Sequence, residues 1–210
     1  MDVLIHPAYL PNIASFAAIS QKKILWEVHD NYQKQTYRNR SYICTDQGRF
    51  MLSIPIIHKG KEQGRQLYKD VELENTSRWQ RQHWRTLQTA YRTSPFFEYY
   101  EDEIEPLFSK KFKFLLDFNF AAIEVLASCL QIEIDGNKTK YFHASAHELI
   151  DARFLVNAKK QLALEQESYM QVFHEKHGFI PNCSVIDLLF NEGTAAADYL
   201  KNINLNFLHA

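Results

Sequence analysis

The opening of the chain constrains its fold most, because it reads as strand, helix and strand in quick succession. Val3–Ile5 is a short apolar run that stops before a Pro-bounded loop, and residues 13–20 then repeat apolar side chains at helical spacing. Residues 24–28 form a second β-leaning run, which ends at the polar residues 29–31. Two strands joined by one helix pair in parallel through a crossover connection. The pattern therefore predicts a βαβ unit and, with it, an α/β protein with a partly parallel sheet.

A β-hairpin is predicted next. Residues 42–44 and 50–57 favour strands, and the segment between them, 45–49, is rich in turn-forming residues. The glycine-containing segment 60–65 is expected to be a loop, and residues 71–73 a short edge strand.

The central region is predicted to be helical. Apolar side chains recur at helical spacing in residues 78–92, with Thr76 or Ser77 as the N-cap. A second helix is expected to start at Ser94, which precedes a proline suited to a first helical turn. A third helix spans residues 112–130, and its apolar positions nearly surround it, which implies deep burial.

The last third of the chain alternates short elements. β-leaning runs at 132–134 and 141–142 are expected to pair around a turn, and the alternating run at 169–173 predicts a further strand. Ser184 is a good N-cap for a helix that Gly193 would end.

The composition fits one ordinary globular domain. Hydrophobic residues make up 46% of the 210 residues and charged residues 23%, which excludes a disordered or fibrous protein. One core suffices for this length, so we expect a single domain over residues 1–210. The 24 basic and 25 acidic side chains give a net charge of −1, which provides no general attraction for nucleic acid or an anionic membrane.

Cysteine usage and the short apolar runs predict a cytoplasmic protein. The three cysteines, Cys44, Cys129 and Cys183, are odd in number, widely spaced and without a CxxC pair, so neither a disulfide framework nor a zinc ribbon is predicted. The apolar run at the N-terminus is too short for a signal peptide. No stretch approaches the roughly 20 apolar residues of a membrane span. The sequence does not decide the oligomeric state.

The loop after the first strand is the first candidate ligand site. Open α/β sheets bind ligands at the carboxyl ends of strands and at helix N-termini, which is where residues 6–12 are expected to lie. His6 would add a hydrogen-bond donor or a general acid, because its unperturbed pKa lies near neutrality. The alternative is that Pro7 and Pro11 stiffen a tight turn and His6 bonds a neighbouring carbonyl. The loop contains no GxGxxG or Walker motif.

The polar residues after the second strand are the second candidate. If the two strands are adjacent and parallel, Asp30 lies beside His6. A carboxylate next to an imidazole is the minimum equipment for moving a proton or holding an amine. The alternative is that Asp30 caps the segment that follows.

Two arginines form the third candidate. Arg38 and Arg40 flank Asn39, and on a strand they would share one face. Two guanidinium groups on one face suit a phosphate or carboxylate, which guanidinium binds in a bidentate manner. The alternative is that the pair is solvated or forms salt bridges.

Ser184 and Asp187 offer a weaker, hydrolase interpretation. There is no GxSxG elbow, and a serine N-cap followed three residues later by an acid is typical of a helix start. The nine histidines show no HExxH spacing, and His174 and His177 fit a surface turn, so no metal site is predicted.

Three segments carry a resemblance to a known family. His6-Pro7-Ala8-Tyr9-Leu10-Pro11 matches a Gln-Pro-x-Tyr/Phe-Leu/Phe-Pro stretch, with His6 in the place of the usual Gln. Arg38-Asn39-Arg40 matches an Asn-Arg element, and Tyr169-x-Gln171 with the run from Gly178 to Gly193 matches a C-terminal signature. Together these segments resemble the WbqC-like proteins encoded among bacterial surface-polysaccharide genes, and with the strand before His6 the resemblance spans residues 3 to 193 in order.

The resemblance implies a transferase that passes a glycyl or other small acyl or aminoacyl group to an amino sugar in O-antigen biosynthesis. Its partners would be a nucleotide-linked amino sugar and a small acyl or aminoacyl donor, with no cofactor and no metal. His6 and Asp30 would be catalytic, and the substrate would be bound by Tyr9, Arg38, Asn39, Arg40, Tyr169, Gln171 and Asn182. These roles require the Pro-flanked loop, the arginine pair and the Tyr-Gln segment to gather around one cleft.

A non-catalytic binding or scaffold protein of a glycan-assembly pathway is the alternative. Two departures from the family pattern favour it. His6 replaces the usual Gln, and the region between about 150 and 169 is shorter than in longer members.

Overall fold

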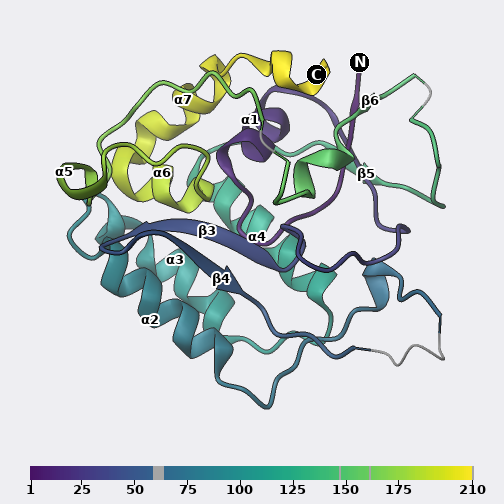
Figure 1. The fold of residues 1–210 in the computed structure, drawn as a ribbon, viewed down its shortest axis with the longest axis horizontal. Helices are drawn as coiled ribbons and strands as arrows, with labels where there is room; N and C mark the ends of the chain where they lie inside the picture. Colours follow the sequence, from purple (N-terminus) through teal and green to yellow (C-terminus); the bar gives the residue numbers. More distant parts are fainter. Residues whose placement is uncertain (59–63, 147, 161, 210) are drawn as a thin grey trace.

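The computed structural model describes residues 1–58, 64–146, 148–160 and 162–209, so most of the predicted loop at 60–65 lies outside the described residues. In Figure 1 the hairpin of β3 and β4 crosses the view, with α2 and α3 on one side of it and α6 and α7 on the other. The helices and strands in chain order are β1 (Val3–Ile5), α1 (Ile13–Gln21), β2 (Ile24–Trp26), β3 (Arg40–Thr45), β4 (Gly48–Ser53), α2 (Trp79–Tyr91), α3 (Phe97–Ser109), α4 (Leu115–Cys129), β5 (Gly136–Lys138), β6 (Ile150–Asp151), α5 (His174–His177), α6 (Val185–Glu192) and α7 (Ala196–Asn202). The 3₁₀ turns η2 (Tyr68–Asp70), η3 (Arg153–Val156), η4 (Gly193–Ala195) and η5 (Leu205–His209) connect or follow them.

Four parallel strands form the main sheet. Their order is β5-β2-β1-β6, and each neighbouring pair runs parallel. β1 and β2 pair from Val3 opposite Ile24 to Ile5 opposite Trp26, with α1 as the crossover. The predicted βαβ unit and partly parallel sheet are confirmed. Because all four strands point the same way, their carboxyl ends meet at one edge.

The predicted pairing of strands at 132–134 and 141–142 is wrong, because the strand in this region is β5. The polar, exposed segment Gly136–Lys138 pairs in parallel with β2 instead. A Cβ on Gly136 would lie 2.4 Å from Nε1 of Trp26, so only glycine lets the two strands approach beneath the indole. A strand of exposed polar residues leaves no hydrophobic periodicity to detect.

The predicted hairpin is confirmed. β3 and β4 pair antiparallel, from Arg40 opposite Ser53 to Thr45 opposite Gly48, and Gly48 has a φ of +88° that suits the tight turn. The predicted edge strand at 71–73 is wrong, because this segment makes only isolated bridges.

The three central helices are confirmed, but their predicted caps are wrong. α2 has no side-chain cap, because Thr76 and Ser77 bond the carboxylate of Glu74 instead. The hydroxyl of Ser94 donates to the carbonyl of Tyr91 at 2.7 Å, so it closes the end of α2 rather than the start of α3.

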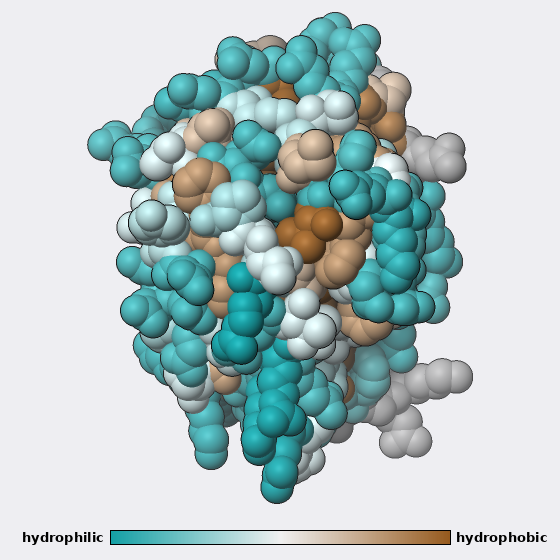
Figure 2. All heavy atoms as spheres, turned by 90° about the vertical axis from the view of Figure 1, so that its left-hand side faces the viewer, coloured by the Kyte–Doolittle hydropathy of each residue, from teal (hydrophilic) through white to brown (hydrophobic). Residues whose placement is uncertain are grey.

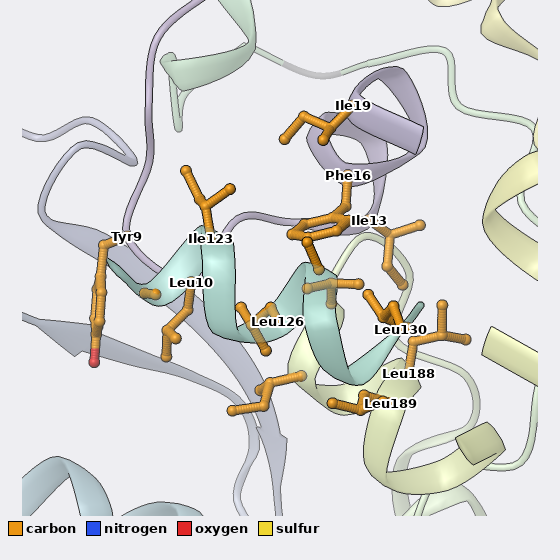
Figure 3. Close-up of a cluster of buried hydrophobic side chains, with 14 of the residues drawn as sticks. Tyr9, Leu10, Ile13, Phe16, Ile19, Ile123, Leu126, Leu130, Leu188 and Leu189 are labelled. Carbon is orange, nitrogen blue, oxygen red and sulfur yellow. The ribbon is translucent and has the colours of Figure 1, made fainter. Parts of the chain in front are cut away.

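The hydrophobic core lies where α1, α4 and α6 meet. Figure 3 shows side chains of these three helices directed at one another, together with Tyr9 and Leu10 from the loop after β1. Burial on several sides of α4 agrees with its nearly continuous apolar pattern. The labelled core residues are Tyr9, Leu10, Ile13, Phe16, Ile19, Ile123, Leu126, Leu130, Leu188 and Leu189.

The C-terminal third contains one confirmed prediction and one wrong one. Ser184 caps α6 through a bond from the backbone N–H of Ile186, and Gly193 ends the helix with a φ of +54°. Residues 169–173 form no strand, although burial alternates over residues 169–171 as the sequence pattern predicts. The alternation is produced by side-chain contacts described below.

The surface is predominantly polar on the side that carries α5. Figure 2 shows this face as mostly hydrophilic, with a few hydrophobic side chains gathered near its centre. Within the described ranges, no helix is long and apolar enough to cross a membrane.

Candidate functional site

The carboxyl edge of the parallel sheet gathers ionisable and polar side chains. His6 follows β1, Glu27 follows β2, Thr139 follows β5 and Arg153 lies just after β6. The strand β1 is central, and the chain continues from it to strands on both sides. This is the kind of switch point at which open α/β sheets bind ligands.

His6, Asp30 and Arg38 form the centre of this cluster. Nη2 of Arg38 lies 2.8 Å from Nε2 of His6 and 2.9 Å from Oδ2 of Asp30. The distance from Nε2 of His6 to Oδ2 of Asp30 is 3.1 Å. The predicted proximity of His6 and Asp30 is confirmed, and Arg38 joins them from the turn that precedes β3.

The surroundings of His6 define its protonation. Nδ1 lies 3.2 Å from the carbonyl oxygen of Glu27, which can only accept, so Nδ1 carries the proton. Burial lowers the pKa of His6; the Asp30 carboxylate opposes this shift and the Arg38 charge adds to it. The ring is therefore neutral at pH 7, with Nε2 as the acceptor for Arg38. The sequence allows two interpretations of His6, a ligand-site residue or a residue that bonds a neighbouring carbonyl. His6 bonds the carbonyl of Glu27 and also belongs to the charged cluster.

Asp30 is ionised and is the most accessible member of the three. Partial burial disfavours its charge, but at the acid pH where Asp30 titrates a protonated His6 and the Arg38 charge outweigh burial and lower the pKa of Asp30. The backbone N–H of Asn31 donates to Oδ1 at 2.6 Å. The side chain of Asp30 is 14% exposed, whereas the side chains of His6 and Arg38 are almost completely buried.

Arg38 is held in place by a hydrogen bond to its backbone carbonyl and by an aromatic ring beside its guanidinium group. Nδ2 of Asn119, on α4, donates to the carbonyl of Arg38 at 2.7 Å and to the hydroxyl of Tyr68 at 2.5 Å. The guanidinium carbon lies 5.4 Å from the centre of the Tyr68 ring. The Tyr68 hydroxyl donates to the carbonyl of Pro7 at 2.8 Å. These contacts fix the turn of Arg38 against the Pro-bounded loop.

The Arg38 guanidinium has unused hydrogen-bonding capacity. The residue is 1% exposed, yet within the described part of the chain its Nε and Nη1 atoms have no hydrogen-bond partner. An unpaired buried donor costs about 1 to 3 kcal/mol, and more when it is charged. A carboxylate or phosphate would supply the missing acceptors.

Glu27 is a second buried carboxylate of the cluster that the sequence analysis did not single out. It is 0% exposed, and its Oε1 accepts from the backbone N–H of His29 at 2.8 Å and from the Thr139 hydroxyl at 3.1 Å. Nη1 of Arg153 lies 3.9 Å from its Oε2. An acidic residue inside an otherwise apolar β-leaning run was the available signal.

Arg153 ties the edge of the site to the segment that follows β5. Its guanidinium pairs with Asp151 through contacts of 2.8 and 2.5 Å and donates to the carbonyl of His143 at 2.6 Å. On that side of the sheet, Leu4, Leu25, Thr139 and His143 help to line a cavity of about 480 Å³.

Arg40 and Asn39 lie beside a different hollow. Arg40 is the first residue of β3, whereas Arg38 is in a turn, so the two side chains do not share a strand face. Both Asn39 and Arg40 line a cleft of about 400 Å³. Nδ2 of Asn39 donates to the carbonyl of Ile54 at 2.9 Å, which holds one wall of this cleft.

Tyr9 is part of the core rather than of an open surface. Its ring is fully buried, and its hydroxyl lies 2.7 Å from Nδ1 of His83 on α2. Burial lowers the pKa of His83 to about 4, so this imidazole is neutral and accepts the hydrogen bond.

Tyr169 and Gln171 belong to a separate buried network around Asp187. Oδ2 of Asp187 accepts from the Tyr169 hydroxyl at 2.5 Å and from Nε2 of Gln171 at 2.8 Å, and Oδ1 accepts from the Tyr91 hydroxyl at 2.7 Å. Burial raises the pKa of Asp187, and the three donors oppose this shift. The structure therefore brings two of the three predicted segments together, and the Tyr-Gln segment lies elsewhere.

The remaining C-terminal candidates have structural contacts. Oδ1 of Asn182 accepts from the backbone N–H of Ala14 at 3.0 Å. The Ser184 hydroxyl is buried and donates to the carbonyl of Leu10 at 2.9 Å, which supports the capping interpretation over a nucleophile. His177 lies near the hairpin turn, 2.8 Å from the carbonyl of Asp46.

Comparison with known proteins identifies related sequences. A model of the WbqC-like protein family matches residues 6–166, a range that includes His6, Glu27, Asp30, Arg38 and Arg153. The protein described as "Uncharacterized protein Rv1507c" of Mycobacterium tuberculosis (strain ATCC 25618 / H37Rv) is 27% identical over 201 residues, covering 81% of this chain and 84% of that relative. No solved structure matches the chain.

Proposed function

The chain belongs to the WbqC-like protein family, and from this membership and the geometry around Arg38 we propose that it is a transferase. It joins a small acyl or aminoacyl group, such as glycyl, to the amine of a nucleotide-linked amino sugar for surface-polysaccharide synthesis. The reaction forms one N–C bond, breaks the bond between the acyl carbon and its carrier, and releases one proton from the amine. The site must therefore hold an anionic substrate and accept a proton.

The observation that carries the proposal is the unsatisfied guanidinium of Arg38. Its Nη2 is committed to His6 and Asp30, while Nε and Nη1 have no partner among the described residues. A phosphate or carboxylate placed against these atoms would satisfy both donors and orient the substrate at the carboxyl edge of the sheet. Two unpaired buried charged donors are costly, which supports an anionic ligand at these atoms.

Asp30 and His6 supply the proton acceptor. Asp30 is the more accessible group, and its Oδ2 lies 3.1 Å from the basic nitrogen of His6. A proton that reaches Asp30 can therefore pass to Nε2 of His6, which becomes a cation beside the carboxylate. The neutral resting state of His6 leaves this nitrogen able to accept.

The experiment is a product assay by mass spectrometry. Purified protein is incubated with UDP- and dTDP-linked amino sugars and with activated glycine and acetyl donors. We expect an added acyl or glycyl mass that disappears in Asp30→Asn. The matched control is Asp117→Asn, on an exposed position of α4, which should retain the product. No product across the whole panel would reject the transferase.

The close packing of the cluster favours one alternative, a non-catalytic binding or scaffold protein of the same pathway. His6 and Arg38 are almost completely buried, as is typical of a structural ion cluster. This alternative predicts that His6→Ala and Asp30→Asn leave any measured activity of a co-purifying partner unchanged. Loss of product in both variants, with folding intact, would exclude it.

A further inference from the structure

The cleft beside Arg40 is positively charged. Its lining includes the cationic side chains Lys34 and Arg40 and the imidazole of His58, and among the described residues it contains no aspartate or glutamate. The chain as a whole is almost neutral, with a net charge of −1. A positive cleft on a neutral protein is a local feature that concentrates anions.

The cleft also presents hydrogen-bond donors that are not used. Nε of Arg40 is buried and has no partner within the described part of the chain. Tyr32 lines the same cleft, and burial raises the pKa of its hydroxyl to about 12, so this hydroxyl remains a donor at pH 7. Arg40 supplies a planar fork and Lys34 a mobile point charge, a combination that suits phosphate oxygens.

The cleft is adjacent to the Arg38 cluster. The charges of both Arg38 and Arg40 reach Tyr32, and Asn39, the residue between the two arginines, lines the cleft. The ring of Tyr32 lies 6.5 Å from that of Tyr68, which carries the Arg38 guanidinium on its face. An anionic substrate at Arg38 can therefore extend past Tyr32 towards Arg40.

We propose that the cleft formed by Tyr32, Lys34, Arg40 and His58 binds a diphosphate group. A cavity of about 400 Å³ with two cationic side chains exceeds what one carboxylate requires and fits two linked phosphates. The inference rests on the proposed function. It assigns the diphosphate to the group that carries the amino sugar, which is the acceptor of the acyl group. That carrier is either a nucleoside or a lipid, and the two share the same diphosphate chemistry.

The test is isothermal titration calorimetry with inorganic pyrophosphate, which requires no turnover. We expect binding to the unmodified protein that weakens with added salt. Arg40→Gln should weaken it roughly tenfold or more, Arg40→Lys should lie between the two, and Lys34→Gln should weaken it several-fold. The matched controls are the exposed Arg81→Gln and Lys111→Gln, outside the cleft, which should bind as the unmodified protein does.

The outcomes separate this inference from the transferase itself. No pyrophosphate binding, or equal affinity in Arg40→Gln and Arg81→Gln, would overturn the diphosphate site even if acyl transfer is observed. Binding that depends on Arg40 supports the site even if no acyl donor is found. Tighter binding of UDP than of pyrophosphate identifies a nucleoside carrier, and tighter binding of a prenyl diphosphate identifies a lipid carrier. Unfolding midpoints of the variants should match the unmodified protein, which separates lost binding from lost folding.

Discussion

Nη2 of Arg38 donates to Nε2 of His6 across 2.8 Å, so the only basic nitrogen of this histidine is engaged in the resting protein. The other ring nitrogen is committed to the carbonyl of Glu27. Protonation of His6 must therefore break the bond from Arg38 and replace it with a bond to Asp30, 3.1 Å away. A substrate anion that draws the guanidinium towards itself would favour this exchange, which couples anion binding to proton acceptance.

Arg38→Lys tests the role of the guanidinium fork. Lysine keeps the positive charge near Asp30, but its single nitrogen lacks the planar fork that lets Arg38 bond His6 and Asp30 through Nη2 and an anion through Nε and Nη1. We expect product formation to fall by roughly a hundredfold or more, since removal of one charged contact in a buried site costs about 3 kcal/mol. Initial rates by mass spectrometry measure this, with the exposed Arg81→Lys as the control. Unchanged rates in Arg38→Lys would remove Arg38 from the site.

His6→Gln separates hydrogen bonding from proton transfer. A glutamine amide can donate to the Glu27 carbonyl and accept from Arg38, so we expect stability to change by less than about 1 kcal/mol. Glutamine cannot accept a proton, and the rate should fall by about 10² to 10⁴. The affinity for pyrophosphate should not change.

The pH profile gives a second measure of the same substitution. The pKa of His6 lies below its ordinary value, so the rate of the unmodified protein should fall on the acid side of that value. His6→Gln should lose this acid limb. A variant as fast as the unmodified protein, with the same profile, would assign proton acceptance to another group.

The part of the site that could be predicted from the sequence follows from the spacing of apolar residues along short segments. Apolar runs before and after a helical segment predict parallel strands, and parallel strands place the residues after them at one edge. His6 and Asp30 are close for this reason alone. Glu27 follows from the same rule, because it comes directly after β2.

The part that could not be predicted depends on contacts between distant segments. The position of Arg38 is set by Asn119 on α4 and by Tyr68, which periodicity does not connect to residue 38. The sequence pattern around Tyr169 and Gln171 resembles that of a strand, because these two side chains are buried and Met170 between them is exposed. Their partner is a carboxylate on α6, and no local signal identifies Asp187 as buried.

Tyr169→Phe tests whether Tyr169 supports the fold or binds substrate. Removing its hydroxyl takes one of three donors from the buried Asp187, which should cost about 1 to 3 kcal/mol of unfolding free energy. The loss should be larger above the raised pKa of Asp187 than below it, because the charged form of the carboxyl group most needs the donors. Urea unfolding measures this, with Tyr99→Phe, at a residue that is 74% exposed, as the control. Weaker substrate binding at unchanged stability would instead make Tyr169 a substrate contact.

Stability should depend on pH through His83. Its folded pKa of about 4 lies below the ordinary 6.5, so the unfolded chain binds more protons between these values and stability rises with pH across this window. The difference corresponds to about 3 kcal/mol, gained from pH 4 to pH 6.5 and constant above. His83→Gln can still accept from Tyr9 and should flatten the urea midpoints over that range, whereas His209→Gln, at an exposed position, should not. An unchanged slope in His83→Gln would show that folding does not lower the pKa of His83, and the pH dependence would then come from other groups.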